Sequence, residues 1–343
     1  MLHDGLEFYN IAELRTVDTF EGLRLQRVPE EIRLQLNEGT AGTMLSPAGG
    51  EIRFRIAEGK DSVTIRLSAE SPTMVYVYHG PFQGDVWELN TVPKDIKVGT
   101  PKRLAQLTME DFPQINYDFG LVRLCFGGAY PEPVFYHGHS EGVCLPRTCD
   151  VPKKRYLAYG SSITHGIDLS GAALSYPAHV AWRLGMELRN LGASGCCLCE
   201  KAMADYLAEQ PCDIVTLELS VNMLGTFSAE EFRKRAHYLV ERVADADPNR
   251  PVMCITIFPF YHDINPKFRE PKQLSTPQEY REILRDIVRT LARPNVTIVE
   301  GPELLPDPGM LSNDLIHPAA RGMIHMGEEL ARRMQSNLQG SQR

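Results

Sequence analysis

Five apolar segments, separated by helical patterns, restrict the fold of the second half of this sequence. The central ones are apolar almost throughout, as in Ile214-Val-Thr-Leu-Glu-Leu219 and Val252-Met-Cys-Ile-Thr-Ile-Phe258. Continuous apolar strands joined by helices indicate a parallel sheet that is covered on both faces. The expected strands are 155–159, 187–191, 213–219, 251–258 and 295–299, and the expected helices are 177–185, 201–208, 228–244, 277–291 and 318–334.

The first 150 residues have a different pattern, in which apolar and polar residues alternate over short segments. In Ile52-Arg-Phe-Arg-Ile56, for example, the apolar side chains would face a core and the arginines would face water. Turn signals such as Pro47-Ala-Gly-Gly50 separate these segments. Short strands of this kind favour a β-sandwich or jelly roll. The expected strands are 23–28, 51–56, 62–67, 74–79, 85–89, 120–126 and 133–136.

The two patterns meet between Pro146 and Lys154, where two prolines and a charge cluster are typical of a short linker. We therefore expect an all-β sandwich domain over residues 1–150 and an α/β domain over residues 151–343. In an open parallel sheet the ligand site lies at the carboxyl ends of the strands. The segments that follow each expected strand are therefore the place to look for chemistry.

The chain is acidic overall, with 36 Lys and Arg against 44 Asp and Glu and a net charge of −8. This balance argues against nucleic acid or an anionic membrane as a partner, because both need a basic face. The sequence does not open on a basic segment followed by an apolar one, and no segment approaches the ~18 apolar residues of a membrane span. We therefore expect no secretory signal, no membrane contact and a cytoplasmic location.

The eight cysteines lack the spacing of a disulfide framework, so reduced thiols are expected. Two groups raise the question of a metal, namely Cys196-Cys197-Leu198-Cys199 and the pair His137 and His139. A strand would place both histidines on one face. No second Cys/His pair lies at zinc-site spacing from the cysteines. Small core residues are the favoured reading of this cysteine run, and no metal is expected.

Glycine and polar residues follow the expected strands where the strand ends would meet. Gly160-Ser161-Ser162, Ala193-Ser194-Gly195 and Ser220-Val221-Asn222 follow the first three strands, and a fourth segment, Asp314-Leu-Ile-His317, comes just before the last helix. Each has an ordinary structural role by itself, as a helix cap or a turn. Together they supply every part that an acyl-transfer site needs.

Ser162 is the expected nucleophile of that site. A serine hydroxyl is a weak nucleophile that needs an adjacent base, which His317 can supply. Asp314, three residues earlier, can accept from the other ring nitrogen and hold the tautomer. The backbone N–H groups of Ser162 and Gly195 and the side-chain amide of Asn222 are the expected donors to the oxyanion. This chemistry requires no cofactor and no metal.

Three residues beside these motifs are candidates for the wall of the pocket: His165, Met223 and Tyr261. For His165 a solvated position in a loop is the favoured interpretation, and a place in the pocket wall is the alternative. The expected partner is a small-molecule ester, and the oligomeric state, including a homo-oligomer, stays open.

The four motifs, in this order, resemble those of the SGNH hydrolases, also called GDSL-type esterases and lipases. Gly-Ser-Ser162-Ile-Thr is similar to the first block of that family, Ala-Ser-Gly195 to the second, Val-Asn222 to the third and Asp314-x-x-His317-Pro to the last. The resemblance covers about residues 156–334. It implies a flavodoxin-like, three-layer domain and the site roles given above.

The sequence departs from the family pattern at two places, but neither alters Ser162, Gly195, Asn222 or His317. The usual Gly-Asp-Ser-Leu reads Gly160-Ser161-Ser162-Ile163, so that a negative charge beside the site is lost. The usual Gly-x-Asn-Asp reads Ser220-Val221-Asn222-Met223, so that the aspartate after the asparagine is missing. The support that this aspartate gives its loop is therefore in doubt.

A jelly roll ahead of such a domain resembles some bacterial carbohydrate esterases. The resemblance implies a serine esterase that removes a short acyl group, with acetyl favoured, from a carbohydrate or similar polar compound. Two alternatives stay open: acyl transfer by the same triad, or carbohydrate binding by the jelly roll beside an inactive hydrolase domain. An α/β-hydrolase is disfavoured, because the second glycine of Gly-x-Ser-x-Gly is missing after Ser162.

Overall fold

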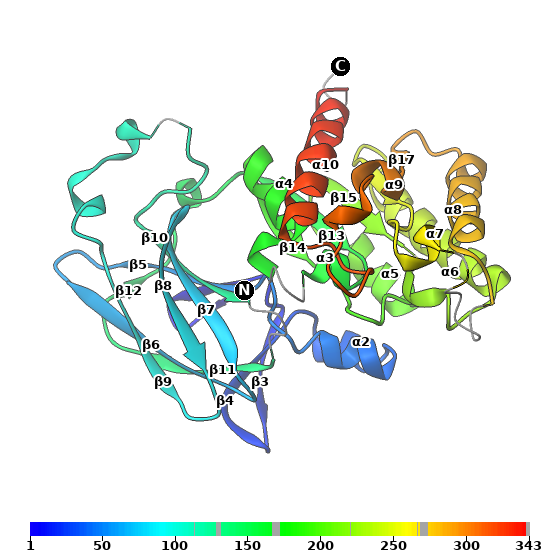
Figure 1. Ribbon diagram of the computed structural model, residues 1–343. Helices are drawn as coiled ribbons and strands as arrows, with labels where there is room; N and C mark the ends of the chain where they lie inside the picture. Colours follow the sequence, from blue (N-terminus) through cyan, green and yellow to red (C-terminus); the bar gives the residue numbers. More distant parts are fainter. Residues whose placement is uncertain are drawn as a thin grey trace.

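The computed structural model describes residues 1–112, 114–127, 132–166, 172–219, 221–265, 267 and 274–340. An all-β half, coloured blue to green in Figure 1, packs against an α/β half coloured green to red. Ser220 of the third motif lies outside the described residues.

Two antiparallel sheets form the all-β half and enclose one apolar core, which confirms the predicted sandwich. Ile52 and Phe54 point into this core from one sheet, and Ile65 and Leu67 from the other; all four are fully buried. The strands of the first sheet are β1 (Leu2–His3), β2 (Leu6–Tyr9), β5 (Glu51–Ile56), β7 (Thr73–His79), β8 (Phe82–Leu89), β10 (Leu121–Gly127) and β12 (Val143–Cys144). Those of the second are β3 (Glu13–Val17), β4 (Phe20–Gln26), β6 (Ser62–Ala69), β9 (Lys94–Gly99) and β11 (Val134–His139).

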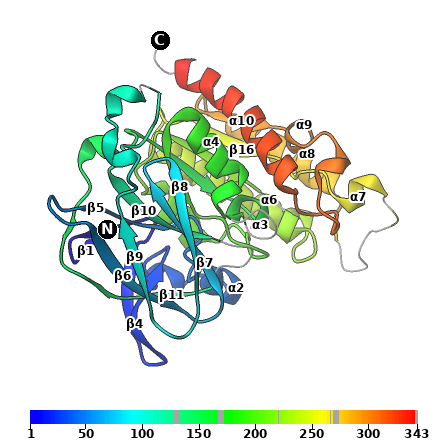
Figure 2. The same cartoon turned by 60° about the vertical axis from the view of Figure 1, so that its left-hand side comes forward.

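Two short helices follow β4 and reach toward the α/β half (Figures 1 and 2). They are α1 (Glu30–Arg33) and α2 (Glu38–Thr43). The Thr40 hydroxyl of α2 donates to the carbonyl of Cys196 at 2.7 Å, beside the second motif. The other helical turns of this half are η1 (Leu104–Gln106), η2 (Met109–Asp111) and η3 (Thr148–Asp150).

The α/β half contains a five-stranded parallel sheet in the order β14-β13-β15-β16-β17. This is the flavodoxin-like order 2-1-3-4-5, so the predicted fold class is confirmed. The strands are β13 (Lys154–Tyr159), β14 (Met186–Asn190), β15 (Ile214–Glu218), β16 (Val252–Ile255) and β17 (Val296–Val299).

Helices cover both faces of this sheet (Figure 1). Leu157 and Tyr159 pack with α5, α6 and α8, whereas Tyr156 and Ala158 pack with α4 and α10, as the two-residue period of a strand requires. The α-helices are α3 (Ser162–His165), α4 (Tyr176–Leu184), α5 (Lys201–Ala208), α6 (Ala229–Ala246), α7 (Tyr261–Ile264), α8 (Pro277–Leu291), α9 (Gly301–Leu304) and α10 (Ala320–Gly340). The 3₁₀ turns are η4 (Ala172–Leu174), η5 (Val221–Met223) and η7 (Pro308–Met310). Among the described helices, none is long and apolar enough to cross a membrane.

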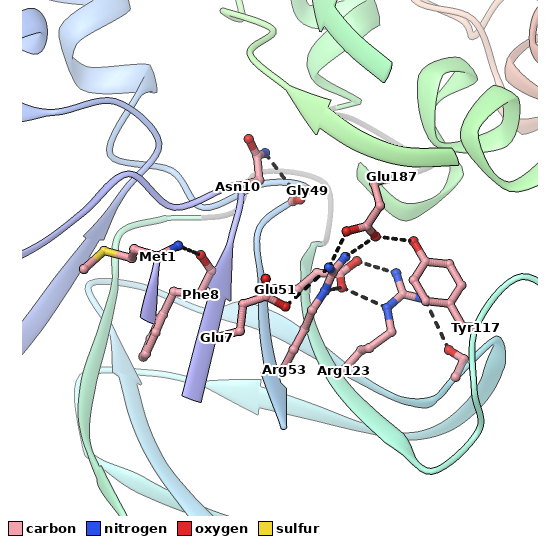
Figure 3. A network of polar contacts seen from close by, with 11 residues as sticks. Met1, Glu7, Phe8, Asn10, Gly49, Glu51, Arg53, Tyr117, Arg123 and Glu187 are labelled. Carbon is pink, nitrogen blue, oxygen red and sulfur yellow. Dashed lines mark hydrogen bonds and ion pairs between the residues drawn. The ribbon is translucent and has the colours of Figure 1, made fainter. Parts of the chain in front are cut away.

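A buried ionic network joins the two halves (Figure 3). The guanidinium of Arg53 on β5 donates to both carboxylate oxygens of Glu187 on β14, at 2.8 and 2.9 Å, and to Glu51 at 2.6 Å. The Tyr117 hydroxyl also donates to Glu187, at 2.9 Å, and the Arg53 guanidinium lies 3.8 Å from the centre of the Tyr9 ring. The expectation that Arg53 faces water is therefore wrong, because its side chain is 1% exposed and the α/β half covers it.

Candidate active site

Ser162 begins a helical turn at the end of a buried strand. The chain leaves β13 at Tyr159, passes through Gly160, and enters α3 with Ser161 as the N-cap, whose hydroxyl accepts from the N–H of Ile163 at 3.2 Å. As the first residue of the helix, Ser162 has a backbone N–H without a partner inside that helix.

His317 and Asp314 lie in line with the Ser162 hydroxyl. The distance from Ser162 Oγ to His317 Nε2 is 2.7 Å, and the distance from His317 Nδ1 to Asp314 Oδ2 is 2.6 Å. Ser162 is 155 residues from His317 in the chain, so the fold itself brings the two together.

A tight turn holds the Asp314 carboxylate in place. Its Oδ1 accepts from the Ser312 hydroxyl at 2.7 Å and from the N–H groups of Ile316 and His317 at 2.8 and 3.0 Å. Leu315 takes a left-handed conformation within the turn, with a φ of +59°. Burial alone would raise the pKa of Asp314, but the hydrogen bonds from His317, Ser312 and the backbone outweigh it and hold that pKa well below its usual range. Asp314 is therefore ionised at neutral pH.

The second and third motifs are bonded to each other and to the first. The N–H of Ala193 donates to the carbonyl of Gly160 at 2.8 Å, and the N–H of Cys197 donates to Oδ1 of Asn222 at 3.1 Å. The latter bond identifies the oxygen of the Asn222 amide and leaves its NH₂ group to face elsewhere. Gly195 has a φ of +69°, which favours glycine, and a Cβ built there would meet no atom within 4 Å.

The three candidate pocket residues lie at different depths. His165 is 2% exposed, so the favoured position in a solvated loop is wrong; burial, followed by the charge of Arg27, holds its pKa well below the usual range. Met223 is fully buried in the core, and Tyr261 is half-buried, with its N–H donating to the carbonyl of Leu315 at 2.7 Å. Their role as pocket residues stays a prediction.

Glu218 is a residue of the site that the sequence analysis missed. It ends β15, is fully buried, and its carboxylate accepts from the backbone N–H of Ser161 at 2.6 Å and from the Ser161 hydroxyl at 2.7 Å. A negative charge was expected to be lost at Ser161, but the structure supplies a carboxyl group from another strand. Burial raises the pKa of Glu218 to about 7, although Ser161, Thr164 and His317 act to lower it. The sequence signal was a single acidic residue in an otherwise uncharged strand.

Arg27 was missed as well, and it attaches the sandwich to the second motif. Its fully buried guanidinium donates to the carbonyls of Asn190 and Gly192, at 3.3 and 3.0 Å, and to those of Thr43 and Ser46, at 2.8 and 2.7 Å. No carboxylate accepts from it in the described chain, and burial lowers its pKa to about 9. The all-β half thus contributes directly to the position of the loop that carries Gly195.

Among the described residues, no three or more His, Cys, Asp or Glu side chains are grouped so that they could bind a metal ion. Cys197 and Cys199 are buried, and Cys197 Sγ donates to the backbone carbonyl of Glu218 at 3.8 Å. These two side chains belong to the apolar core, as the sequence favoured.

Residues 153–335 match the model of the GDSL-like lipase/acylhydrolase family. The chain belongs to this family. Membership makes it an enzyme of ester chemistry, and it confirms the resemblance that the four motifs indicated. No curated protein matches the sequence.

Several solved structures share the fold of this GDSL-like enzyme over nearly its whole length. Salicylyl-acyltransferase SsfX3 from a tetracycline biosynthetic pathway has a TM-score of 0.72 and 18% identity, with 97% of this chain and 94% of that chain covered. A GDSL-like lipase from Bacteroides ovatus has a TM-score of 0.70 and 16% identity, with 98% and 96% covered. A family two carbohydrate esterase from Clostridium thermocellum, solved with cellohexaose, has a TM-score of 0.65 and 14% identity, with 97% and 99% covered. At these identities the similarity concerns the fold, and it includes the sandwich.

Proposed function

We propose that this GDSL-like enzyme hydrolyses a short acyl ester through an acyl-enzyme on Ser162. The observation that carries the proposal is the distance of 2.7 Å between Ser162 Oγ and His317 Nε2. A serine hydroxyl becomes an effective nucleophile when a base at this distance accepts its proton. Asp314, at 2.6 Å from the other ring nitrogen, fixes the tautomer in which Nε2 carries no proton and can act as that base.

The reaction proceeds in two steps. Ser162 Oγ attacks the ester carbonyl while His317 takes its proton, and the tetrahedral intermediate then expels the alcohol, which receives this proton. A water molecule next gives a proton to His317 and attacks the acyl-enzyme. The second intermediate releases the carboxylic acid, and the proton returns from His317 to Ser162.

The backbone N–H groups of Ser162 and Gly195 and the Asn222 amide are proposed as donors to the oxyanion. The bond from Cys197 N–H to Asn222 Oδ1 supports this role, because it orients the NH₂ group away from Cys197. We expect Asn222→Ala to lower kcat by about 10²–10³-fold with little change in KM, because the oxyanion that Asn222 would bind develops in the transition state and is absent from the bound substrate. Steady-state kinetics with an aryl acetate check this, and a rise in KM alone would contradict it.

Asp314→Asn is expected to lower kcat by about 10²–10⁴-fold, because an amide can no longer hold the Nδ1–H tautomer of His317 as a carboxylate does. A fluorophosphonate probe should label this variant more slowly than the wild type, with the same final stoichiometry. Labelling at the wild-type rate would show that Asp314 stabilises its turn but does not support catalysis by His317.

The substrate is proposed to be an ester of a carbohydrate or a similar polar compound, with acetyl as the favoured acyl group. The family two carbohydrate esterases among the solved structures that share the fold support this choice. The acyltransferase among those structures favours a second candidate, acyl transfer to an alcohol or sugar by the same triad. Product analysis with an acceptor present separates them, because a transferase forms a new ester whereas a hydrolase forms only free acid.

An aryl acetate and a fluorophosphonate probe test the acyl-enzyme directly. We expect turnover of the acetate, one probe molecule bound per chain, and a labelled peptide that contains Ser162. Labelling of another residue, or a lack of both turnover and labelling, would refute the proposal and would favour an inactive domain beside a carbohydrate-binding sandwich.

We propose residues 1–150 and 151–343 as two domains that act as one unit, with the sandwich as a packing module rather than an independent carbohydrate-binding module. The bonds of Arg53 to Glu187 and of Arg27 to Gly192 support this view. The predicted cytoplasmic location is supported by the eight cysteines, all of which are free thiols.

A further inference from the structure

Glu218 binds the turn that carries the nucleophile, although the reaction proposed above assigns it no step. One carboxylate oxygen, Oε2, accepts from the backbone N–H and the hydroxyl of Ser161, at 2.6 and 2.7 Å. The Thr164 hydroxyl donates to the same oxygen at 3.1 Å. These bonds attach both the residue before Ser162 and the residue two places after it to a single atom on β15.

With Glu218 ionised, the hydroxyl protons in this cluster have one consistent arrangement. Thr164 gives its only hydroxyl proton to Glu218, so the Tyr176 hydroxyl, at 2.7 Å, must donate to Thr164. Ser161 likewise gives its proton to Glu218, and its oxygen accepts from the N–H of Ile163 at 3.2 Å. The Ser161 and Thr164 hydroxyls therefore each donate once and accept once, and the direction of every bond leads to Glu218.

The strand register places Glu218 beside the turn. Tyr159 of β13 pairs with Leu217 of β15, so Gly160 and Glu218 are the next positions along the two strands. A Cβ at Gly160 would lie 2.5 Å from Glu218 Oε2 and 2.3 Å from Thr164 Oγ1, closer than side chains can approach. Glycine at 160 thus makes room for the carboxylate under the peptide that leads to Ser162.

We propose that Glu218 is a positioning residue that holds the Ser161–Ser162 turn in reach of His317, in place of the aspartate that the Gly-Asp-Ser block of this family carries before the serine. The inference rests on the proposed role of Ser162. The carboxyl group comes from the third strand here, while Ser161 supplies the hydroxyl that binds it. The departure at Ser161 and the acidic residue in β15 are then two parts of one substitution.

Other polar groups also face Glu218 from the elements around it. Tyr176 reaches it through Thr164, Cys197 Sγ donates to its backbone carbonyl, and His317 lies near enough to interact electrostatically. The second carboxylate oxygen, Oε1, is buried and has no hydrogen-bond partner among the described residues. Only Oε2 is therefore engaged with the turn, and an acceptor at that one place is what a replacement must preserve.

Two replacements of matched size test whether the acceptor matters. Glu218→Leu removes it and leaves the Ser161 and Thr164 donors unpaired, whereas Glu218→Gln keeps one oxygen that can face Ser161. We expect Glu218→Leu to lower kcat by about 10²-fold, the effect of a displaced nucleophile, with little change in KM. Glu218→Gln should lose about 10-fold or less. A Glu218→Leu variant that melts as a folded protein and keeps wild-type kcat would overturn the proposal.

A double variant gives a readout that lost stability alone would not produce. Ser161→Asp by itself should lower kcat, because two carboxyl groups would then share one buried site. Adding Glu218→Gln to it should raise kcat again by about 10-fold, as the second carboxyl is removed and an amide donor appears. If Glu218→Gln lowers kcat equally in both backgrounds, the two positions act independently and the proposal fails.

The wild-type labelling experiment distinguishes a failure of this inference from a failure of the proposed function. If the probe labels Ser162 in the wild type and the Glu218→Leu variant is labelled at the same rate, Ser162 is the nucleophile but Glu218 does not position it. If the wild type is labelled elsewhere or not at all, the proposed function itself fails, and the positioning role fails with it.

Discussion

Ser162→Ala should lower kcat/KM toward an aryl acetate by about 10⁴–10⁶-fold and abolish labelling by a fluorophosphonate. The variant removes the atom that attacks the carbonyl, while the donors proposed for the oxyanion stay in place. The double variant with His317→Ala should be no slower than either single variant, because the two side chains act as one unit and either loss disables both.

Ser336→Ala is a matched control for this experiment. Ser336 lies exposed on α10, far from Ser162 in the chain, and its hydroxyl donates to the carbonyl of Arg332, so its loss should leave kcat and labelling unchanged. Turnover by Ser162→Ala at more than about a tenth of the wild-type rate would contradict the proposed nucleophile, since removal of a triad serine leaves only a trace of activity.

Arg53→Met is expected to lower the free energy of unfolding of the whole chain by about 3–5 kcal/mol. The variant leaves the Glu187 carboxylate, which is 6% exposed, without the two bonds that neutralise it. Glu51 also loses a bond from Arg53, although Arg123 still donates to it. Unfolding in urea, followed by circular dichroism, measures the change.

Two further variants make this result specific. Arg66→Met removes the exposed pair with Asp95 in the same sandwich and should change stability by about 0–1 kcal/mol. Adding Glu187→Met to Arg53→Met should recover much of the loss, because apolar side chains of similar volume often replace a buried ion pair without penalty. If Arg53→Met destabilises no more than Arg66→Met, the ionic network does not hold the two halves together.

Local patterns predicted the α/β half closely. Both α5 and α8 have the bounds that the sequence indicated, and β13 to β17 lie within one to three residues of their predicted ends. The spacing of apolar residues within each segment decides this, and it needs no knowledge of distant parts of the chain. The sandwich was recovered as a class, but β1, β2, β3, β9 and β12 were missed. Most of these strands are short or lie at a sheet edge, where the pattern is weak.

The candidate site likewise contains residues that the sequence predicted and residues that only the structure revealed. Ser162, Gly195, Asn222, Asp314 and His317 were predicted because each follows a strand end or precedes a helix, and because their order resembles that of a known family. Glu218 and Arg27 were missed, since their partners lie 57 and more than 160 residues away in the sequence. An acidic residue within β15 marks Glu218 in the sequence, but nothing near either residue indicates its partners.

The stretch Gly160-Ser161-Ser162 was thus sufficient, with the later motifs, to predict an acyl-transfer site at the end of a parallel sheet. The tertiary structure alone decided that the Glu218 carboxylate lies beside the turn of that serine and that the α/β half covers Arg53. Helices, strands and turns depend on side chains a few residues apart, so they can be read from sequence. Buried charges depend on which surfaces pack together: the register of β13 on β15 sets a carboxylate beneath the nucleophile, and the packing of the sandwich on β14 pairs Arg53 with Glu187.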